Sequence, residues 1–324
     1  MSRTPEIAQG MIKSGLVKEL VNRGLRGGPG AASLSAWCLG ALIHTDAIAD
    51  ALADQHFVIP DLVDHLRNTT NLGPNATPGD ISSGLFAIAR LSRSIRLAKA
   101  LAKAGCVDLL AHHLNTSSDP EVLNWSARAV GCLMRPNSSD MSKVLLEHGT
   151  ATGLARMPRV LPQDEVEPLA SFAFAISRFS CAEWGGGTRK ALVEAGVVDS
   201  LLSALRTAAD EPYPEVHIEL ALAVSFLGDV GGSAIRKEII NAGGVKILKE
   251  IAKEAVNGTI GAGRGDEVAK ACNMAATSIS GNIWTRNAAS AKTAMNHNWS
   301  GGCPEYHPPS PLKFQLPFDP MAAT

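Results

Sequence analysis

One short pattern recurs along this chain: a helix-forming stretch ends on a small residue and a glycine, and a second helix-like stretch starts at once. The copy "KALVEAGVVDSLLSALRT" begins at Lys190. Glycine supplies the positive φ that a Cβ would penalise, so the pattern predicts two helices joined at a one-residue hinge. The second helix carries an apolar face that needs a neighbour to cover it, made of Val197, Val198, Leu201, Leu202 and Leu205.

Related copies occur at regular intervals, as in "KALAKAGCVDLLAHHLNT", "KVLLEHGTATGLARM", "KEIINAGGVKILKEIAKE" and "GMIKSGLVKELVNRGL". In "QHFVIPDLVDHL" a phenylalanine replaces the glycine and the apolar spacing is kept. The intervals between hinges are 42, 48, 44, 47 and 47 residues, counted between Gly15, Phe57, Gly105, Gly149, Gly196 and Gly243. Helical repeats of two or three helices have periods of roughly 40–47 residues. Six units are therefore expected, from about Thr4 to Trp284.

A second pattern recurs in register with the hinge and predicts a third helix in each unit. "DPEVLNWSARAVGCL", "QDEVEPLASFAFAISRF", "YPEVHIELALAVSFL" and "GDEVAKACNMAATSIS" open on proline or glycine with acids and continue into small apolar residues. Proline and acids suit the first turn of a helix. Units one and two close similarly, with "AWCLGAL" and "LFAIARL". On these two linked patterns the chain resembles the armadillo repeat family, whose units have a short first helix and two longer ones, the third lining a concave groove.

The resemblance implies an all-α, right-handed armadillo-like solenoid over residues 1–298, followed by an extended Pro-rich tail over residues 299–324. The composition agrees, since the chain is 45% hydrophobic but only 5% aromatic. A core of Ala, Leu, Val and Ile suits closely stacked helices. A solenoid grows by adding units, so one continuous domain is expected. Such a fold hosts many unrelated roles and does not identify a function.

In importin-α and its relatives, the third helix carries a tryptophan and, four residues later, an asparagine that holds the peptide backbone. The closing motifs of this chain place at the tryptophan-like position Trp37, Phe86, Arg128, Phe174, Leu222 and Ala275. The asparagine-like position holds Ala41, Arg90, Cys132, Arg178, Phe226 and Ile279. The asparagine ladder is absent, which argues against binding of nuclear localisation signals.

The candidate partner-binding residues of the concave groove are therefore the aromatic and arginine side chains Trp37, Phe86, Arg90, Arg128, Phe174 and Arg178. Aromatic side chains anchor interfaces and arginine binds carboxylates bidentately. An acidic, partly apolar segment of a partner protein would fit. The alternative is that the aromatic rings pack between repeats and the arginines cap backbone carbonyls.

The leading functional hypothesis is a non-catalytic scaffold or adaptor for protein–protein interaction. One alternative is a structural subunit of a larger assembly, and another is an unrecognised enzyme or small-molecule binder with a site between solenoid and tail. A net charge of -1 and a pI near 6.8 argue against a nucleic-acid surface. No membrane span is expected. The location is expected to be cytoplasmic, with the nucleus and, less favoured, the mitochondrion as alternatives.

The usual catalytic motifs are missing, including a Gly-rich phosphate loop, "GxSxG", "HExxH" and paired "CxxC", so no enzyme activity, cofactor or small-molecule substrate is expected. The six cysteines have no close pairs and are expected to be reduced core residues. In the tail, "CPEYHPP" combines nucleophile, acid and base types at Cys303, Glu305 and His307, but prolines supply no pocket.

Two clusters have metal-ligand residue types, but no metal site is expected. Asp46, Asp50 and Asp54 lie four residues apart on one predicted helix face, and a solvated acidic stripe is the simpler interpretation. His112 and His113 are adjacent, so their side chains point to different sides of a helix.

The tail breaks the repeat pattern, because six prolines fall between Pro304 and Pro320. They forbid a continuing helix and favour an extended chain. The tail nevertheless carries bulky apolar side chains, which a disordered segment usually lacks. We expect it to dock on the solenoid, more across the groove than over the end, through Leu312, Phe314, Leu316 and Phe318.

Deleting residues from Gly301 onward is expected to lower the melting temperature if the tail caps the last unit, or to raise partner affinity if it occupies the groove. Thermal melts and binding assays of the full-length and shortened chains measure the two effects. Unchanged stability and binding, with rapid proteolysis of the tail in the full-length chain, would identify the tail as a free linker.

Overall fold

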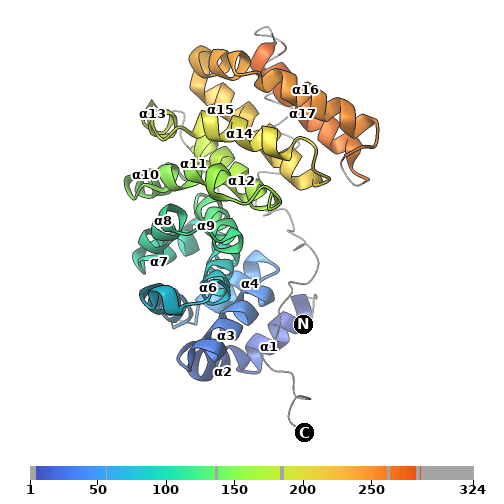
Figure 1. Ribbon diagram of the computed structural model, residues 1–324. Coiled ribbons are helices and arrows are strands. Elements are labelled where there is room, and N and C mark those ends of the chain that lie inside the picture. Colours follow the sequence, from blue (N-terminus) through green and yellow to red (C-terminus); the bar gives the residue numbers. More distant parts are fainter. Residues whose placement is uncertain are drawn as a thin grey trace.

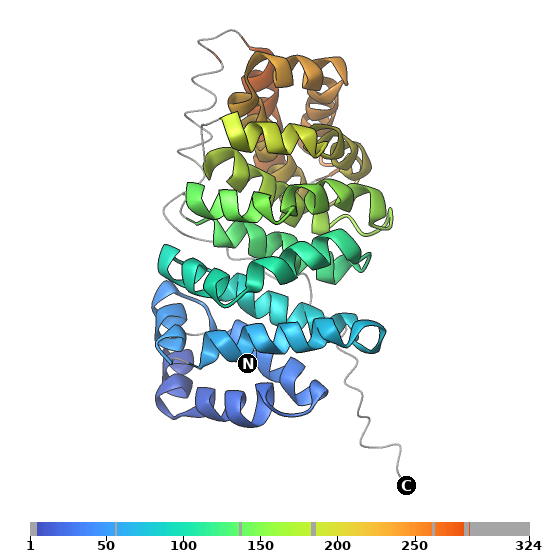
Figure 2. The same cartoon turned by 90° about the vertical axis from the view of Figure 1, so that its left-hand side faces the viewer.

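The protein is described by a computed structural model that covers residues 5–55, 57–135, 138–182, 186–260 and 263–281, together with Thr285. These residues form a stack of helices in which the chain runs from one end to the other (Figure 1 and Figure 2). The described ranges contain no β-strand. The all-α solenoid expected from the sequence is therefore confirmed. The tail over residues 299–324 lies outside the described residues.

The helices group into six units of three. The first helices are α1 (Pro5–Lys13), α4 (Asp46–Ala53), α7 (Ile95–Lys103), α10 (Ser139–Glu147), α13 (Gly186–Glu194) and the second part of α15 (Pro214–Asn241). The second helices are α2 (Leu16–Glu19) with the π-helical turn η1 (Leu20–Leu25), α5 (Val58–Asn71), α8 (Cys106–Thr116), α11 (Thr150–Val160), α14 (Val197–Ala208) and α16 (Gly244–Val256). The third helices are α3 (Pro29–Leu42), α6 (Pro78–Leu91), α9 (Pro120–Leu133), α12 (Pro168–Ala182), the first part of α15, and α17 (Gly265–Ser280). A short 3-10 turn, η2 (Gly73–Asn75), precedes α6.

The hinges lie where the repeat pattern predicted them. The five hinge glycines, Gly15, Gly105, Gly149, Gly196 and Gly243, all have positive φ, between 76° and 92°. Phe57 has a φ of -91° and ψ of -17°, so the residue at the hinge position of this unit is right-handed, unlike the five glycines. The unit that lacks the glycine keeps its helix pair, α4 and α5.

Two connections differ from the sequence expectation. In unit four, "QDEVEP" was expected to open the third helix, but α12 begins at Pro168. Proline has no N–H and clashes with the preceding turn, so it starts a helix more readily than it continues one. Between units five and six the chain makes no loop, because α15 runs through a kink at Gly232, where φ is 68° and ψ is -158°. This conformation is essentially confined to glycine.

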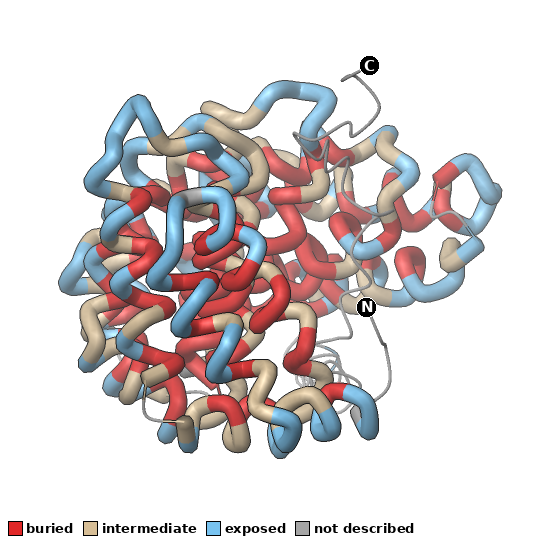
Figure 3. The backbone as a smooth tube through the Cα atoms, turned by 90° about the horizontal axis from the view of Figure 1, so that it is seen from below, coloured by how far each residue is buried: buried red, intermediate tan, exposed pale blue. Residues whose placement is uncertain are grey.

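The core runs through the inside of the whole stack. Figure 3, seen from below, shows buried backbone at the centre and exposed turns around it. The buried side chains are mainly Ala, Leu, Val and Ile, as the composition indicated. The largest fully buried ones include Phe172 and Phe179, both on α12 in the fourth unit.

Second helices are also tied to the following unit by polar contacts at a fixed register. Ten residues after the hinge, Arg67 donates from Nη2 to the carbonyl oxygen of Ala104 at 2.9 Å, just before the next hinge. Arg206 makes the equivalent bond to Ala242 at 2.8 Å. Asn115, at the same register, donates to the carbonyl oxygen of Gly149 at 3.4 Å. The C-terminal carbonyls of a first helix are thus satisfied by the unit before it.

Replacing Gly196 by alanine is expected to lower the free energy of unfolding by about 1–2 kcal/mol, because a left-handed conformation is strained for any residue with a Cβ. No atom lies within 4 Å of the added Cβ, so the cost reports backbone strain alone. Gly10, in the middle of α1, is the matched control, since its added Cβ also meets nothing within 4 Å. Denaturant unfolding should show a loss for Gly196→Ala and no loss for Gly10→Ala; equal curves would contradict the hinge assignment.

Candidate functional site

The candidate binding residues lie on the row of third helices. These helices pack directly on one another in the order α3, α6, α9, α12, α15 and α17. Their close approach depends on small residues three positions after the tryptophan-like position, which are Gly40, Ala89, Gly131, Ser177, Ser225 and Ser278. A Cβ on Gly40 would lie 2.6 Å from the Phe86 ring and 3.0 Å from the Cα of Ala87. We call the surface formed by this row the third-helix face.

Aromatic rings from three consecutive units join into a row on this face. The rings of Trp37 on α3 and Phe86 on α6 stack with centroids 4.1 Å apart and an interplanar angle of 27°. Phe86 also meets the ring of Trp125 on α9 edge to face, at 4.7 Å and 69°. Trp37 and Phe86 are half-buried, whereas Trp125 is buried. This aromatic row therefore presents two of its three rings in part to the surface.

Arg90 lies one turn beyond Phe86, at the C-terminal end of α6, and is half-buried. Its Nη2 donates a hydrogen bond to the carbonyl oxygen of Ile43, the residue that ends α3. Arg90 thus caps the neighbouring helix, as the alternative interpretation of the sequence expected, at the edge of the aromatic row.

The other three candidate residues form a second cluster farther along the face. The guanidinium carbon of Arg128 lies 4.6 Å from the centroid of the Phe174 ring, and that of Arg178 lies 5.2 Å from it. Both distances allow cation–π attraction. Arg128 also donates from Nε to Ser171 Oγ at 3.2 Å. The two arginines are only 5% and 6% exposed, so this cluster is part of the packing between units three and four.

The structure thus separates the predicted residues into two groups. Trp37, Phe86 and Arg90 are brought together at a partly open surface, while Arg128, Phe174 and Arg178 are brought together inside. Trp125 was missed, because the alignment placed Arg128 at the tryptophan-like position. The signal was present, since Trp125 precedes Arg128 by three residues and so occupies the same side of the helix.

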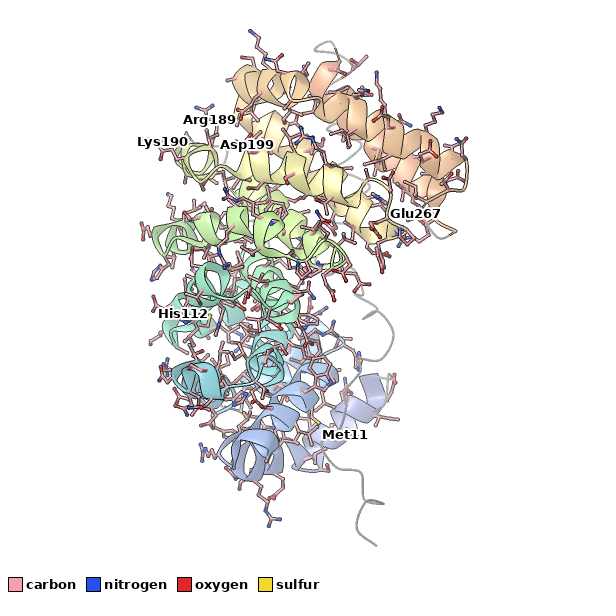
Figure 4. The ribbon with its side chains drawn as sticks, in the orientation of Figure 1. Met11, His112, Arg189, Lys190, Asp199 and Glu267 are labelled. Carbon is pink, nitrogen blue, oxygen red and sulfur yellow. The ribbon has the colours of Figure 1, made fainter. Side chains whose placement is uncertain are left out.

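The two ends of the third helices differ in charge. Acidic residues gather at their N-terminal ends, where a negative charge interacts favourably with the helix dipole. In units four and five burial raises the pKa of Glu167, and the nearby charges of Glu165 and Glu215 raise it further. At unit six Arg264 binds Glu267 at 2.6 Å and also pairs with Glu215. Figure 4 shows Glu267, in the first turn of α17, on one side of the stack. The third-helix face therefore has an acidic edge, and Arg90 lies near the other edge.

The acidic stripe on α4 is neutralised by the next unit. Arg93 pairs with Asp46 at 2.5 Å, and Arg96 pairs with Asp50 at 2.5 Å and with Asp54 at 3.2 Å. The stripe therefore joins α4 to the start of α7 instead of being merely solvated. Among the described residues, no group of three or more His, Cys, Asp or Glu side chains is arranged to hold a metal ion.

The adjacent histidines differ in burial, but contrary to expectation their rings lie close together, edge to face, with centroids 5.3 Å apart. His112 is exposed and His113 is buried, with its Nε2 2.9 Å from Thr70 Oγ1. Burial, followed by the charge of His112, lowers the pKa of His113 to about 4, so its imidazole is neutral at pH 7. His113 is thus held in the core as a neutral hydrogen-bonding side chain.

The cysteines within the described ranges are free thiols, and all but Cys181 are buried. Burial raises the pKa of Cys106 and of Cys272 to about 12, which disfavours the reactive thiolate. Cys303, Glu305 and His307, and the tail-docking residues Leu312, Phe314, Leu316 and Phe318, lie outside the described residues. No helix in the described part of the chain is long and apolar enough to cross a membrane.

Comparison with known proteins supports the fold. No protein-family model and no curated protein matches the chain. A designed armadillo repeat protein superposes with a TM-score of 0.56 at 16% identity, over 80% of this chain and 98% of that one. A second, in complex with the peptide (KR)4, gives 0.57 at 18%, over 85% and 99%. A structure from a study of the interaction between cadherin and beta-catenin gives 0.61 at 16%, over 88% of this chain and 48% of that one. The chain therefore has the armadillo-like fold.

Replacing Gly131 by alanine is expected to lower the free energy of unfolding by about 1–3 kcal/mol, since the added Cβ would overlap the Phe174 ring. Gly30, also on a third helix, is the control, because its added Cβ meets nothing within 4 Å. Urea unfolding of the two variants measures the difference. If Gly131→Ala is as stable as Gly30→Ala, the close approach of α9 and α12 is not needed for stability.

Proposed function

We propose that this protein is a non-catalytic scaffold that binds an extended segment of a partner protein across the third-helix face of units one to three. The observation that carries the proposal is the partly open aromatic row formed by Trp37 and Phe86, with Arg90 beside it. Aromatic side chains that are held rigidly by neighbours make good interface anchors, since little conformational entropy is lost on binding.

The positive charge of Arg90 beside the half-buried ring of Phe86 favours an acidic, partly apolar segment. Arg90 lies next to Phe86 and already binds a carbonyl oxygen, so it is oriented along the edge of the row. Arginine binds carboxylates with good geometry. The segment would lie near the C-terminal ends of α3 and α6, away from the acidic residues Glu165, Glu167 and Glu215.

Two of the similar structures are named as designed armadillo repeat proteins, and one of these is in complex with a peptide. That peptide, (KR)4, is basic, and a basic segment would be attracted by the acidic edge instead of the aromatic row. The cytoplasmic location expected from the sequence remains part of the proposal. So does the role as an adaptor, with a subunit of a larger assembly as the alternative.

The test uses a random-peptide library displayed on phage and panned on the full-length protein. A tail variant, Phe314→Ser with Phe318→Ser, is panned in parallel, so that a tail lying on the face cannot hide the site. Selected peptides should combine Asp or Glu with aromatic or aliphatic residues. The variant Trp37→Leu with Phe86→Leu keeps apolar side chains beside Gly40 and should weaken their binding at least about tenfold.

The matched control is Val193→Ser, which removes an exposed apolar side chain from α13, a first helix. It should leave the affinity within about twofold. Peptides rich in Lys and Arg that are insensitive to the aromatic variant but lost in Glu215→Gln would move the site to the acidic edge. Failure to select any peptide with either form of the protein would overturn the proposed function.

A further inference from the structure

The last unit exposes a surface of its second helix that in every earlier unit packs against the next unit. We call this contact between the second helices of consecutive units the joint. In units two to five the second helix packs against the second helix of the next unit, as α5 does with α8 and α14 with α16. The residue six positions after the hinge lies in that joint. In unit five it is Leu202, and a Cβ built on Gly244 of unit six would lie 2.7 Å from its Cδ2. Ser200 likewise donates across the joint to the carbonyl oxygen of Ala155.

The residues at this position are apolar and buried in the first five units and are Val21, Val63, Ala111, Ala155 and Leu202. In unit six the same position holds an exposed lysine, Lys249. The position two after the hinge is buried in units one to five, but Val245 in unit six is half-exposed. The sequence of α16 therefore differs from the earlier second helices at the positions where a seventh unit would pack.

The two other joint positions also hold lysines in unit six. Three residues after the hinge, Asp108 of unit three meets His148 of unit four at 3.2 Å, and unit six has Lys246 there. Ten residues after the hinge, Arg67 and Arg206 bind the carbonyls of the next unit, and unit six has Lys253. All three lysines are exposed. They lie along α16 (Gly244–Val256), at the positions through which the earlier second helices contact a neighbour.

Between the lysines lies an open, largely apolar hollow of about 560 Å³, lined also by Ile240 and Val245. Ile240 is 44% exposed, and Val256 on the same helix as the lysines is 66% exposed. One carboxylate, Glu250, lies 3.7 Å from Lys246. This end face therefore combines exposed apolar side chains with the net positive charge that its lysines give it.

Charge disfavours two occupants from the same protein, residues 286–304 and a second copy of the chain. Residues 286–304 contain Arg286 and Lys292 and no Asp or Glu. In a head-to-tail contact with a second copy, the second helix of unit one would approach the end face. That helix and the residue after it carry Lys18, Arg23 and Arg26 against a single acid, Glu19. Like charges would oppose the lysines in both cases.

We propose that the end face of unit six docks an acidic amphipathic helix of a partner protein, packed as the second helix of a seventh unit would be. Its apolar side chains cover Ile240 and Val245. Its carboxylates meet Lys246, Lys249 and Lys253, which are exposed along α16. The surface continues an interface that the protein already forms between its own units, so a helix fits it better than an extended chain does. This surface is separate from the third-helix face.

The test uses the full-length protein and a phage-displayed library built on a single-helix peptide with randomised outer faces. Selected helices are expected to carry an excess of Asp and Glu beside Leu or Ile at helical spacing. Their affinity should fall at least about tenfold in Lys249→Glu with Lys253→Glu. It should also fall when the salt concentration is raised from about 50 to 300 mM, since exposed charges are screened.

The matched control is Lys99→Glu with Lys103→Glu, which reverses two exposed lysines on α7. It should leave the affinity within about twofold, and both double variants should keep the melting temperature of the parent. Failure to select helices, selection without an acidic excess, or equal effects of the two double variants would overturn the proposal. Binding of vesicles with about 30% phosphatidylserine that is lost only in Lys249→Glu with Lys253→Glu, without any helix being selected, would assign the surface to a lipid membrane instead.

Discussion

The structure depends on the packing of each three-helix unit against the next. A single unit has second and third helices with apolar faces that it cannot cover by itself, and the following unit covers both. On the third-helix side the contact is close because small residues such as Gly40 and Gly131 let a ring from the next unit approach the backbone. On the second-helix side it is reinforced by side chains that bind the carbonyls before the next hinge. The hinge therefore joins two helices of its own unit, and the carbonyls before it accept hydrogen bonds from the preceding unit.

The same packing explains why the arginines and aromatic rings of the third-helix face behave differently along the stack. In units one and two the half-buried rings of Trp37 and Phe86 stack on one another, and Arg90 binds the carbonyl oxygen at the end of α3. In units three and four the guanidinium groups of Arg128 and Arg178 both lie over one ring, that of Phe174, and all three side chains are buried. A face that looks uniform in a repeat alignment is thus divided into an accessible part and a packed part.

The two proposed surfaces follow from the ways in which the repeat is interrupted. The third-helix face is partly open at the aromatic row, where Trp37 and Phe86 are half-buried. The end face is open because unit six has no following unit among the described residues. Lysines occupy the positions of α16 at which the earlier second helices contact the next unit. Charge distinguishes the partners only in part, since both surfaces favour acidic segments, but their shapes differ: one is a row of rings and the other is a helix-packing joint.

The sequence by itself determined the helices, the hinges and the number of units. These depend on local properties, namely glycine at positive φ, apolar spacing within one helix, and proline with acids at helix starts. Even there, the kink at Gly232 and the late start of α12 at Pro168 required the structure, because the connections between helices are set by how the units pack. Only the tertiary structure decided which candidate residues are accessible, that Trp125 joins the aromatic row, and that Lys249 occupies a joint. Those facts depend on contacts between residues roughly one repeat apart, which no local pattern encodes.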